Sequence, residues 1–248
     1  MPFLRPKRLP KRLQEELTLR ESILTIPINE IFEPREGCPI CRMRDMLEQR
    51  TTEYIMGAAM MEPDVRIETN RLGFCKTHFD QMLKQKNRLS LALMLQTRLE
   101  TLKKDVYSKP SFFESKQKRV KSLSKSNSTC FVCSKVDWAM ERLLVTVFDM
   151  YKNSSEFRSL FKEQEFICAP HCEMLCTAAP DALDRRTALD FRDDCFALAR
   201  KQIELLYKDV SHFCSMFDYR NNGENADWGN SRDSVERSVE FLTSRKAK

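Results

Sequence analysis

Two short motifs, CxxC and CxxH, carry the most specific chemical signal in this sequence of 248 residues. Two cysteine sulfurs in one tight turn can point at a single cation, and a Cys and a His three residues apart at the start of a helix can do the same. The positive N-terminal end of such a helix also favours the thiolate form of cysteine. Each motif occurs twice. The eight residues, in chain order, are Cys38, Cys41, Cys75, His78, Cys130, Cys133, Cys168 and His171.

The two copies of this motif pair have nearly the same spacing. The CxxC is followed by the CxxH after 33 residues in the first copy and after 34 in the second. The offset between copies is 92 residues for the CxxC motifs and 93 for the CxxH motifs. Other residues keep this register, among them Asp45 with Asp137 and Arg50 with Arg142. We interpret the pattern as an internal duplication.

Each copy supplies three Cys and one His, so we predict two structural zinc ions per chain. The order of the motifs favours pairing each CxxC with the CxxH that follows it. A helix after the CxxC carries the chain ~30 Å away, and the 13 residues from 62 to 74 can return it by about the same distance. We therefore expect one zinc at Cys38, Cys41, Cys75 and His78, and the other at Cys130, Cys133, Cys168 and His171.

A closed set of four protein ligands leaves no coordination position for a substrate or an activated water. The zinc interpretation thus points away from metal catalysis. The five glycines are too dispersed to form a phosphate-binding loop of the dinucleotide or P-loop type. We recognise no catalytic constellation and favour a protein that is not an enzyme. The alternatives to zinc are an iron–sulfur cluster or a redox pair of Cys38 and Cys41.

The four remaining cysteines are expected in the hydrophobic core. Cys172 follows His171 directly and is an alternative fourth ligand. Its counterpart in the first copy is Phe79, however, which favours a core position for Cys172. The four are Cys172, Cys176, Cys195 and Cys214.

Helices must position these motifs. Apolar residues recur at three- and four-residue steps after each CxxC, over residues 42–61 and from 136 to 151, and the same pattern returns after each CxxH, over 79–106 and 184–217. No convincing strand pattern occurs, so the predicted class is all-α. Shorter helices are expected at 64–70 and 156–162. The last long helix is expected to bury a stripe of Phe191, Cys195, Leu198, Leu205, Val210, Phe213 and Phe217.

The positive charge is unevenly distributed along the chain. The net charge is +6, and residues 103–128 alone hold eight Lys/Arg against two acidic residues. We therefore do not expect a basic folded surface. The predicted organisation is a disordered basic extension (1–22), a first zinc-helical repeat (23–106), a basic Ser/Lys linker (107–128), a second zinc-helical repeat (129–217) and a C-terminal tail with a short helix (218–248).

The C-terminal tail contains three large aromatic residues, Phe217, Tyr219 and Trp228, within twelve positions. We expect them to dock the tail against the helical body. The alternative is a pocket wall in which Asp218 and Arg220 bind a ligand.

The sequence contains no apolar stretch long enough to cross a membrane and no apolar segment typical of a secretion signal. Ten cysteines in a chain of this kind favour a reducing compartment. We accordingly expect a cytoplasmic protein with no membrane partner.

Several ordered motifs resemble one uncharacterised bacterial family, domain of unknown function 6062. They are residues 24–30 before the first CxxC, residues 73–78 around the first CxxH, and residues 217–220 and 228–230 of the tail. The resemblance extends from about Leu24 to Leu242. It implies a bacterial cytoplasmic protein and supplies no reaction.

We take the first functional hypothesis to be a zinc-stabilised helical protein that binds a protein partner, in a regulatory role. A second hypothesis is nucleic-acid binding by the basic linker and the N-terminal arm, for which a merely solvated linker is the favoured alternative. A third is thiol redox chemistry or an unrecognised enzymatic activity.

Overall fold

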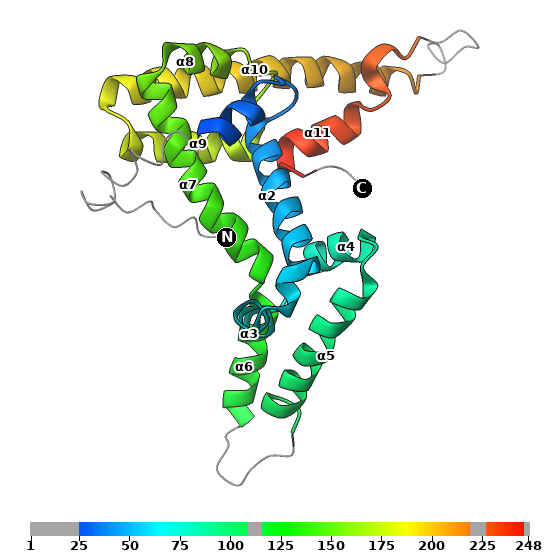
Figure 1. The fold of residues 1–248 in the computed structure, drawn as a ribbon. Helices are drawn as coiled ribbons and strands as arrows, with labels where there is room; N and C mark the ends of the chain where they lie inside the picture. The colour runs from blue at the N-terminus through cyan, green and yellow to red at the C-terminus, as the bar shows by residue number, and fades with distance from the viewer. Residues whose placement is uncertain (1–24, 109–115, 219–226, 246–248) are drawn as a thin grey trace. The chain divides into compact units, whose positions relative to one another are not determined.

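The computed structural model describes residues 25–108, 116–218 and 227–245, and within these ranges it contains helices and no strands (Figure 1). The predicted all-α class is confirmed. The expectation of a disordered extension at residues 1–22 lies outside the described residues. Within those ranges, no helix is both long and apolar enough to cross a membrane.

Residues 25–32 form a first helix, and further helices follow along the chain (Figure 1). They are α2 (Pro39–Met56), η1 (Ala58–Met61), α3 (Pro63–Leu72), α4 (Lys76–Lys84), α5 (Arg88–Asp105), α6 (Lys116–Ser128), α7 (Phe131–Asn153), α8 (Ser155–Lys162), α9 (Ala169–Ala182), α10 (Arg185–Ser215), η2 (Gly229–Ser231) and α11 (Ser234–Thr243).

Local capping explains where several of these helices begin. Ser154 accepts a hydrogen bond from the Phe157 amide at the start of α8, and Asp184 accepts one from the Thr187 amide at the start of α10. Such caps satisfy amides that have no partner inside the helix. Asn87 caps α5 in the same way and divides the predicted helix 79–106 into α4 and α5. That break is a difference from the sequence analysis, and Asn is a favoured capping residue.

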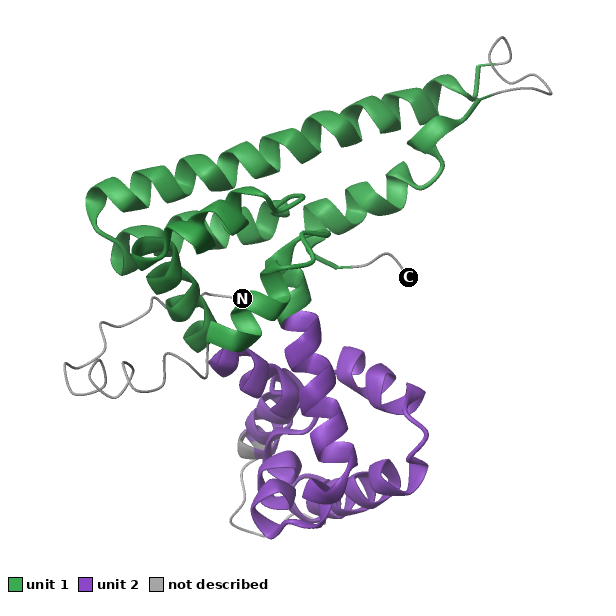
Figure 2. Cartoon of the chain, turned by 45° about the horizontal axis from the view of Figure 1, so that its top comes forward, with its two compact units in different colours: residues 1–43, 141–248 green, residues 44–140 purple. Residues whose placement is uncertain are grey.

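The chain divides into two compact units (Figure 2). Unit 1 consists of residues 1–43 and 141–248, and unit 2 consists of residues 44–140. The divisions fall inside α2 and α7, so α2 begins in unit 1 and ends in unit 2, whereas α7 begins in unit 2 and ends in unit 1. Each unit therefore contains one end of α2 and one end of α7.

Unit 1 has an aromatic core. The rings of Tyr151, Phe161 and Phe191 contact one another, with centroids 4.8–5.5 Å apart, and all three side chains are fully buried. The Tyr151 hydroxyl donates a hydrogen bond of 2.5 Å to Asp194, which satisfies the one polar atom in this cluster. Both α9 and α11 pack against α10.

Unit 2 is built around α3, which packs against η1 and α5. Arg66 of α3 donates hydrogen bonds to the Leu93 carbonyl and to the Thr97 hydroxyl of α5. Arg98 of α5 donates to the Ser126 hydroxyl of α6. Residues 116–128, which we expected to belong to a solvated linker, thus form a helix that is hydrogen-bonded to its own unit.

The buried face of α10 differs from the apolar stripe that the sequence predicts for this helix. Phe191, Cys195 and Leu198 are buried as expected, but Leu205 is 49% exposed and Phe217 is 67% exposed. After Leu198, the buried face continues at Gln202 and Leu206, because residues four positions apart lie close to one line along a helix. Leu205 lies at the edge of this face. The buried residues of α10 are Ala188, Phe191, Cys195, Leu198, Gln202 and Leu206.

The C-terminal tail docks on α10, as predicted. The Trp228 ring lies 5.7 Å from Phe213 and 5.9 Å from Phe217, measured between ring centroids. Arg237 of α11 forms an ion pair of 2.9 Å with Asp209 of α10. Two residues of the predicted tail site, Tyr219 and Arg220, lie outside the described residues.

Candidate metal centres

The structure gathers all eight predicted residues into two groups of four, but the predicted pairing is wrong. Each CxxC faces the CxxH of the other copy. Cluster 1, in unit 1, consists of Cys38, Cys41, Cys168 and His171, and cluster 2, in unit 2, consists of Cys75, His78, Cys130 and Cys133.

The course of α2 explains this exchange. The helix runs without a break from Pro39 to Met56 and carries the chain out of unit 1 into unit 2. We expected residues 62–74 to bring the chain back to the first CxxC, but α3 packs on α5 instead. The spacers of 33 and 34 residues are almost equal, so both pairings close equally well in terms of chain length. Packing of the helices, rather than spacer length, decides the pairing.

Cluster 1 has the dimensions of a tetrahedral metal site. The His171 Nδ1 atom lies 3.6 Å from the Cys38 sulfur, 3.3 Å from the Cys41 sulfur and 3.1 Å from the Cys168 sulfur. The Cys41 and Cys168 sulfurs are 3.7 Å apart. Zinc with ordinary bond lengths would separate two sulfurs by about 3.8 Å and a sulfur from a nitrogen by about 3.6 Å. The four donor atoms therefore surround a space that fits one ion.

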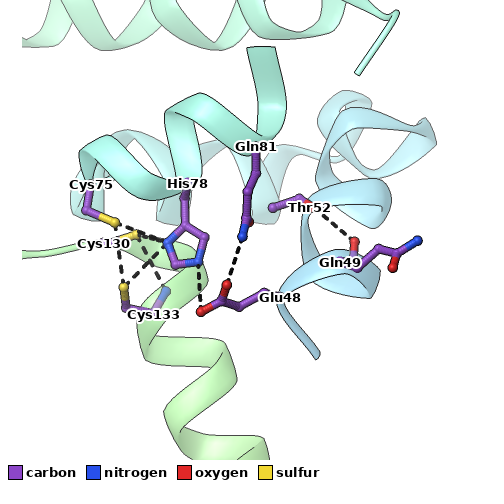
Figure 3. A network of polar contacts seen from close by, with 8 residues as sticks. All are labelled: Glu48, Gln49, Thr52, Cys75, His78, Gln81, Cys130 and Cys133. Carbon is purple, nitrogen blue, oxygen red and sulfur yellow. Dashed lines mark hydrogen bonds and ion pairs between the residues drawn. The ribbon is translucent and has the colours of Figure 1, made fainter. Parts of the chain in front are cut away.

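The four donor side chains of cluster 2 face one another (Figure 3), and their separations are similar to those in cluster 1. The His78 Nδ1 atom lies 3.2, 3.3 and 3.5 Å from the sulfurs of Cys75, Cys130 and Cys133, respectively. The Cys75 and Cys133 sulfurs are 3.8 Å apart. None of the cysteines in either cluster forms a disulfide. The same donor set and the same separations thus occur in both units.

Helix starts supply the ligands in both clusters. Cys38 directly precedes α2, and Cys130 directly precedes α7. Cys75 and Cys168 are the N-caps of α4 and α9. The positive end of a helix dipole stabilises a thiolate there. This is the arrangement that the two motifs predict.

Contacts among the donors favour ionised sulfur at one cysteine of each cluster, whereas hydrogen bonds among the cysteines raise the pKa of Cys133 in cluster 2 and of Cys41 and Cys168 in cluster 1. In cluster 2, the hydrogen bond with the Cys133 side chain is the largest effect on Cys130 and lowers its pKa to about 3. In cluster 1, burial raises the pKa of Cys38, but hydrogen bonds with Cys168 and Cys41 outweigh it and lower the pKa well below its usual value. Each cluster therefore holds a cysteine that ionises readily, as a metal ligand must.

A buried carboxylate accompanies the histidine of cluster 2 but not that of cluster 1. Glu48 of α2 is 4% exposed, and its Oε1 atom lies 3.7 Å from the His78 Nε2 atom (Figure 3). That distance is longer than a hydrogen bond but allows the carboxylate to attract the N–H group. The Gln81 side chain donates a hydrogen bond of 2.8 Å to the other oxygen of Glu48 and holds it in place. Neither the His78 Nε2 atom nor the buried His171 Nε2 atom has a hydrogen-bond partner, but among the described residues only His78 has a carboxylate at ion-pair distance.

Neither Glu48 nor Gln81 is predicted from the sequence. Gln81 lies three residues after His78, but Glu48 lies seven residues after Cys41, on the helix that begins in the other cluster. Proximity along the sequence therefore points Glu48 to cluster 1, and only the fold assigns it to cluster 2.

The other cysteines follow the predictions with one exception. Cys172, Cys176 and Cys195 are buried, and Cys172 is not among the four donors of cluster 1. Cys214 is exposed, which corrects the expected core position. Cys214 lies one residue before the end of α10, outside the buried face of that helix.

The sequence of the chain matches one known family over most of its length. The sequence model described as a family of unknown function (DUF6062) matches residues 19–248, which include all eight donor residues. No curated protein and no solved structure matches the chain.

Proposed function

The chain belongs to the DUF6062 family, whose function is unknown. We propose that it is a helical protein that holds two structural zinc ions and acts in a regulatory role by binding a protein partner. The observation that carries the zinc proposal is the separation of the four donor atoms in each cluster. Sulfur–sulfur distances of 3.7 and 3.8 Å are those of tetrahedral zinc. Three thiolates and one imidazole also suit zinc better than hard cations such as Mg²⁺ or Ca²⁺.

A structural role follows from the connectivity of the clusters. Cys41 and Cys168 are 127 residues apart along the chain, and Cys75 and Cys133 are 58 residues apart. An ion that joins such distant segments contributes its binding free energy to folding. Four protein ligands also leave no position for a substrate, so catalysis at the metal is not part of the proposal.

Elemental analysis of the full chain, purified without chelator under reducing conditions, tests the zinc proposal. We expect two zinc ions per chain. A ratio near zero, or the visible absorption of an iron–sulfur cluster, would contradict it. Zinc that is released by mild oxidant, with formation of a Cys38–Cys41 disulfide, would instead favour the redox alternative.

A second candidate function, nucleic-acid binding, is supported by the charge of unit 2. Residues 44–140 contain 18 Lys/Arg and 11 Asp/Glu, a net charge of +7, of which residues 103–128 supply +6, and five of these basic residues lie on helix α6. On this unit, Trp138 and Tyr54 are 56% and 54% exposed and line a shallow hollow of about 280 Å³ together with Arg50 and Lys135. Aromatic rings beside basic side chains can stack bases and neutralise phosphates.

Binding of a fluorescent single-stranded oligonucleotide tests this second function. We expect affinity to fall steeply with salt concentration, because binding phosphates releases counterions. We also expect Trp138→Ala to weaken binding and Leu242→Ala, at an exposed position of unit 1, to leave it unchanged. Affinity that does not change with salt would rule this function out.

A further inference from the structure

Helix α10 has a second apolar face besides the one that it buries. From residue 196 to residue 217, apolar residues on this face recur at steps of three or four, with a mean period of 3.5 residues. The largest of them are well exposed, at 54% for Leu189, 54% for Phe196, 51% for Ile203, 77% for Tyr207 and 67% for Phe217. We call this face the seam, and its members are Leu189, Phe196, Ala199, Ile203, Tyr207, Val210 and Cys214 of α10, together with Phe217 in the turn just after the helix.

The spacing of the seam is that of a helix which packs against another helix. Leu189, Phe196, Ile203 and two further members are separated by seven residues each. A period of 3.5 residues keeps apolar side chains facing one straight partner helix, as in a coiled coil. The buried face of the same helix already serves the core of unit 1, so the seam requires a separate explanation.

We propose that the seam binds the seam of a second copy of the chain, with the two α10 helices antiparallel and a twofold axis at Ile203. A twofold interface brings the same patch of both copies together, so the patch must complement itself. With the axis at Ile203, Phe196 faces Val210 of the second copy, and Leu189 faces Phe217 of the second copy.

Side-chain size supports this register. Ala199 and Tyr207 lie four residues before and four residues after Ile203, so each faces the other across the axis. The small Ala199 leaves room for the large Tyr207 ring of the second copy. Arg200 would lie beside that same ring, an arrangement that favours a cation–π contact.

The size of the seam is sufficient for a dimer. Five large side chains that are half to three-quarters exposed offer roughly 600 Å² per copy, if a fully exposed side chain of this size has about 200 Å². Two copies would bury about 1,200 Å² in total, the lower end of the range for specific interfaces. Single apolar patches of this size are uncommon on monomers. The area therefore favours a protein surface, and its symmetry favours a second copy.

Sedimentation velocity of the full, metal-loaded chain tests the proposal. We expect a dimer at micromolar concentration and a dissociation constant at least about tenfold higher for Ile203→Glu, which places two carboxylates at the axis. Leu205→Glu is the matched control, because Leu205 is 49% exposed on the opposite side of α10. A monomeric wild type, or equal dissociation of both variants, would overturn the proposal. Both positions are exposed, so thermal melting should confirm that each variant remains folded.

Engineered disulfides test the antiparallel register. Under mild oxidation, Ile203→Cys should form an intermolecular disulfide between its introduced thiols, because residue 203 meets itself at the axis. Val210→Cys should not, because residue 210 faces residue 196 of the second copy. Peptide mapping identifies the bonds against the native cysteines. If both variants cross-link through their introduced thiols, the helices are parallel and the proposed register is wrong.

Discussion

Clusters 1 and 2 have the same donors at the same separations, but the second partner of the histidine differs. His78 has the buried carboxylate of Glu48 3.7 Å from its Nε2 atom, whereas the described residues place no carboxylate at ion-pair distance from His171, and neither Nε2 atom has a hydrogen-bond partner. In the register of the two copies, the position 92 residues after Glu48 is Met140, which cannot supply a carboxylate. Repeated ligand motifs thus define the inner donors, whereas single residues outside the motifs make the two clusters unequal.

Coverage by the C-terminal tail also differs. The Cys41 sulfur of cluster 1 lies 3.9 Å from the Ser244 carbonyl, just after α11. The buried Phe241 of α11 lies 6.1 Å from the Phe166 ring, two residues before Cys168. Cluster 1 is therefore braced by the tail in unit 1, and cluster 2 is braced by Glu48 and Gln81 in unit 2.

Double substitutions give the largest expected effect, because they distinguish the two pairings by zinc content. Cys38→Ser with Cys168→Ser damages only cluster 1 and should leave one zinc per chain. Cys38→Ser with Cys75→Ser damages both clusters and should leave none. Elemental analysis measures the ratio, and the opposite result would support the pairing along the sequence.

Loss of one ligand should destabilise one unit. Cys168→Ser should lower the free energy of unfolding of unit 1, and Cys75→Ser that of unit 2. Each loss should be about 4 kcal/mol if the free zinc concentration is about 1,000-fold above the dissociation constant. Thermal melting with hydrogen exchange assigns the loss to a unit. Cys214→Ser, at an exposed cysteine outside both clusters, is the control and should melt with the wild type. A variant that loses zinc but melts with the wild type would contradict a structural role.

The brace of cluster 1 can be removed alone. Phe241→Ala should cost about 3 kcal/mol or more, as buried aromatic truncations do, and should weaken zinc binding in cluster 1 only. Leu242→Ala is the matched control because Leu242 is 60% exposed on the same helix. Denaturant unfolding measures the stability, and equal losses in the two variants would show that the tail does not brace this unit.

Glu48→Gln should have the smallest effect and the most selective one. The amide keeps the shape of the side chain but lacks the charge that attracts the His78 N–H, so zinc affinity of cluster 2 should fall about 10- to 100-fold. Competition with a chromogenic chelator measures this affinity. Glu53→Gln, on the exposed side of α2, should change neither cluster. If Glu48→Gln leaves both affinities unchanged, the difference between the two histidines has no effect on the metal.

Local features of the sequence determined most elements and all eight donor residues. Capping residues such as Ser154 and Asp184 mark helix starts through contacts a few residues away, so they can be identified without a fold. The CxxC and CxxH motifs are similarly local, because each presents two donors within one turn. The missed break at Asn87 shows that even a local cap can be overlooked inside a continuous apolar pattern.

Only the tertiary structure decided which motifs meet, which carboxylate serves which histidine, and which face of α10 is buried. Spacers of equal length satisfy both pairings, so the choice depends on α2 continuing into unit 2 and on α3 packing against α5. Glu48 is near cluster 1 in sequence and beside cluster 2 in space for the same reason. Two apolar stripes on α10 have similar periodicity, and only the packing of α9 and α11 against one of them leaves the seam exposed. These are long-range choices, and local periodicity contains no information about them.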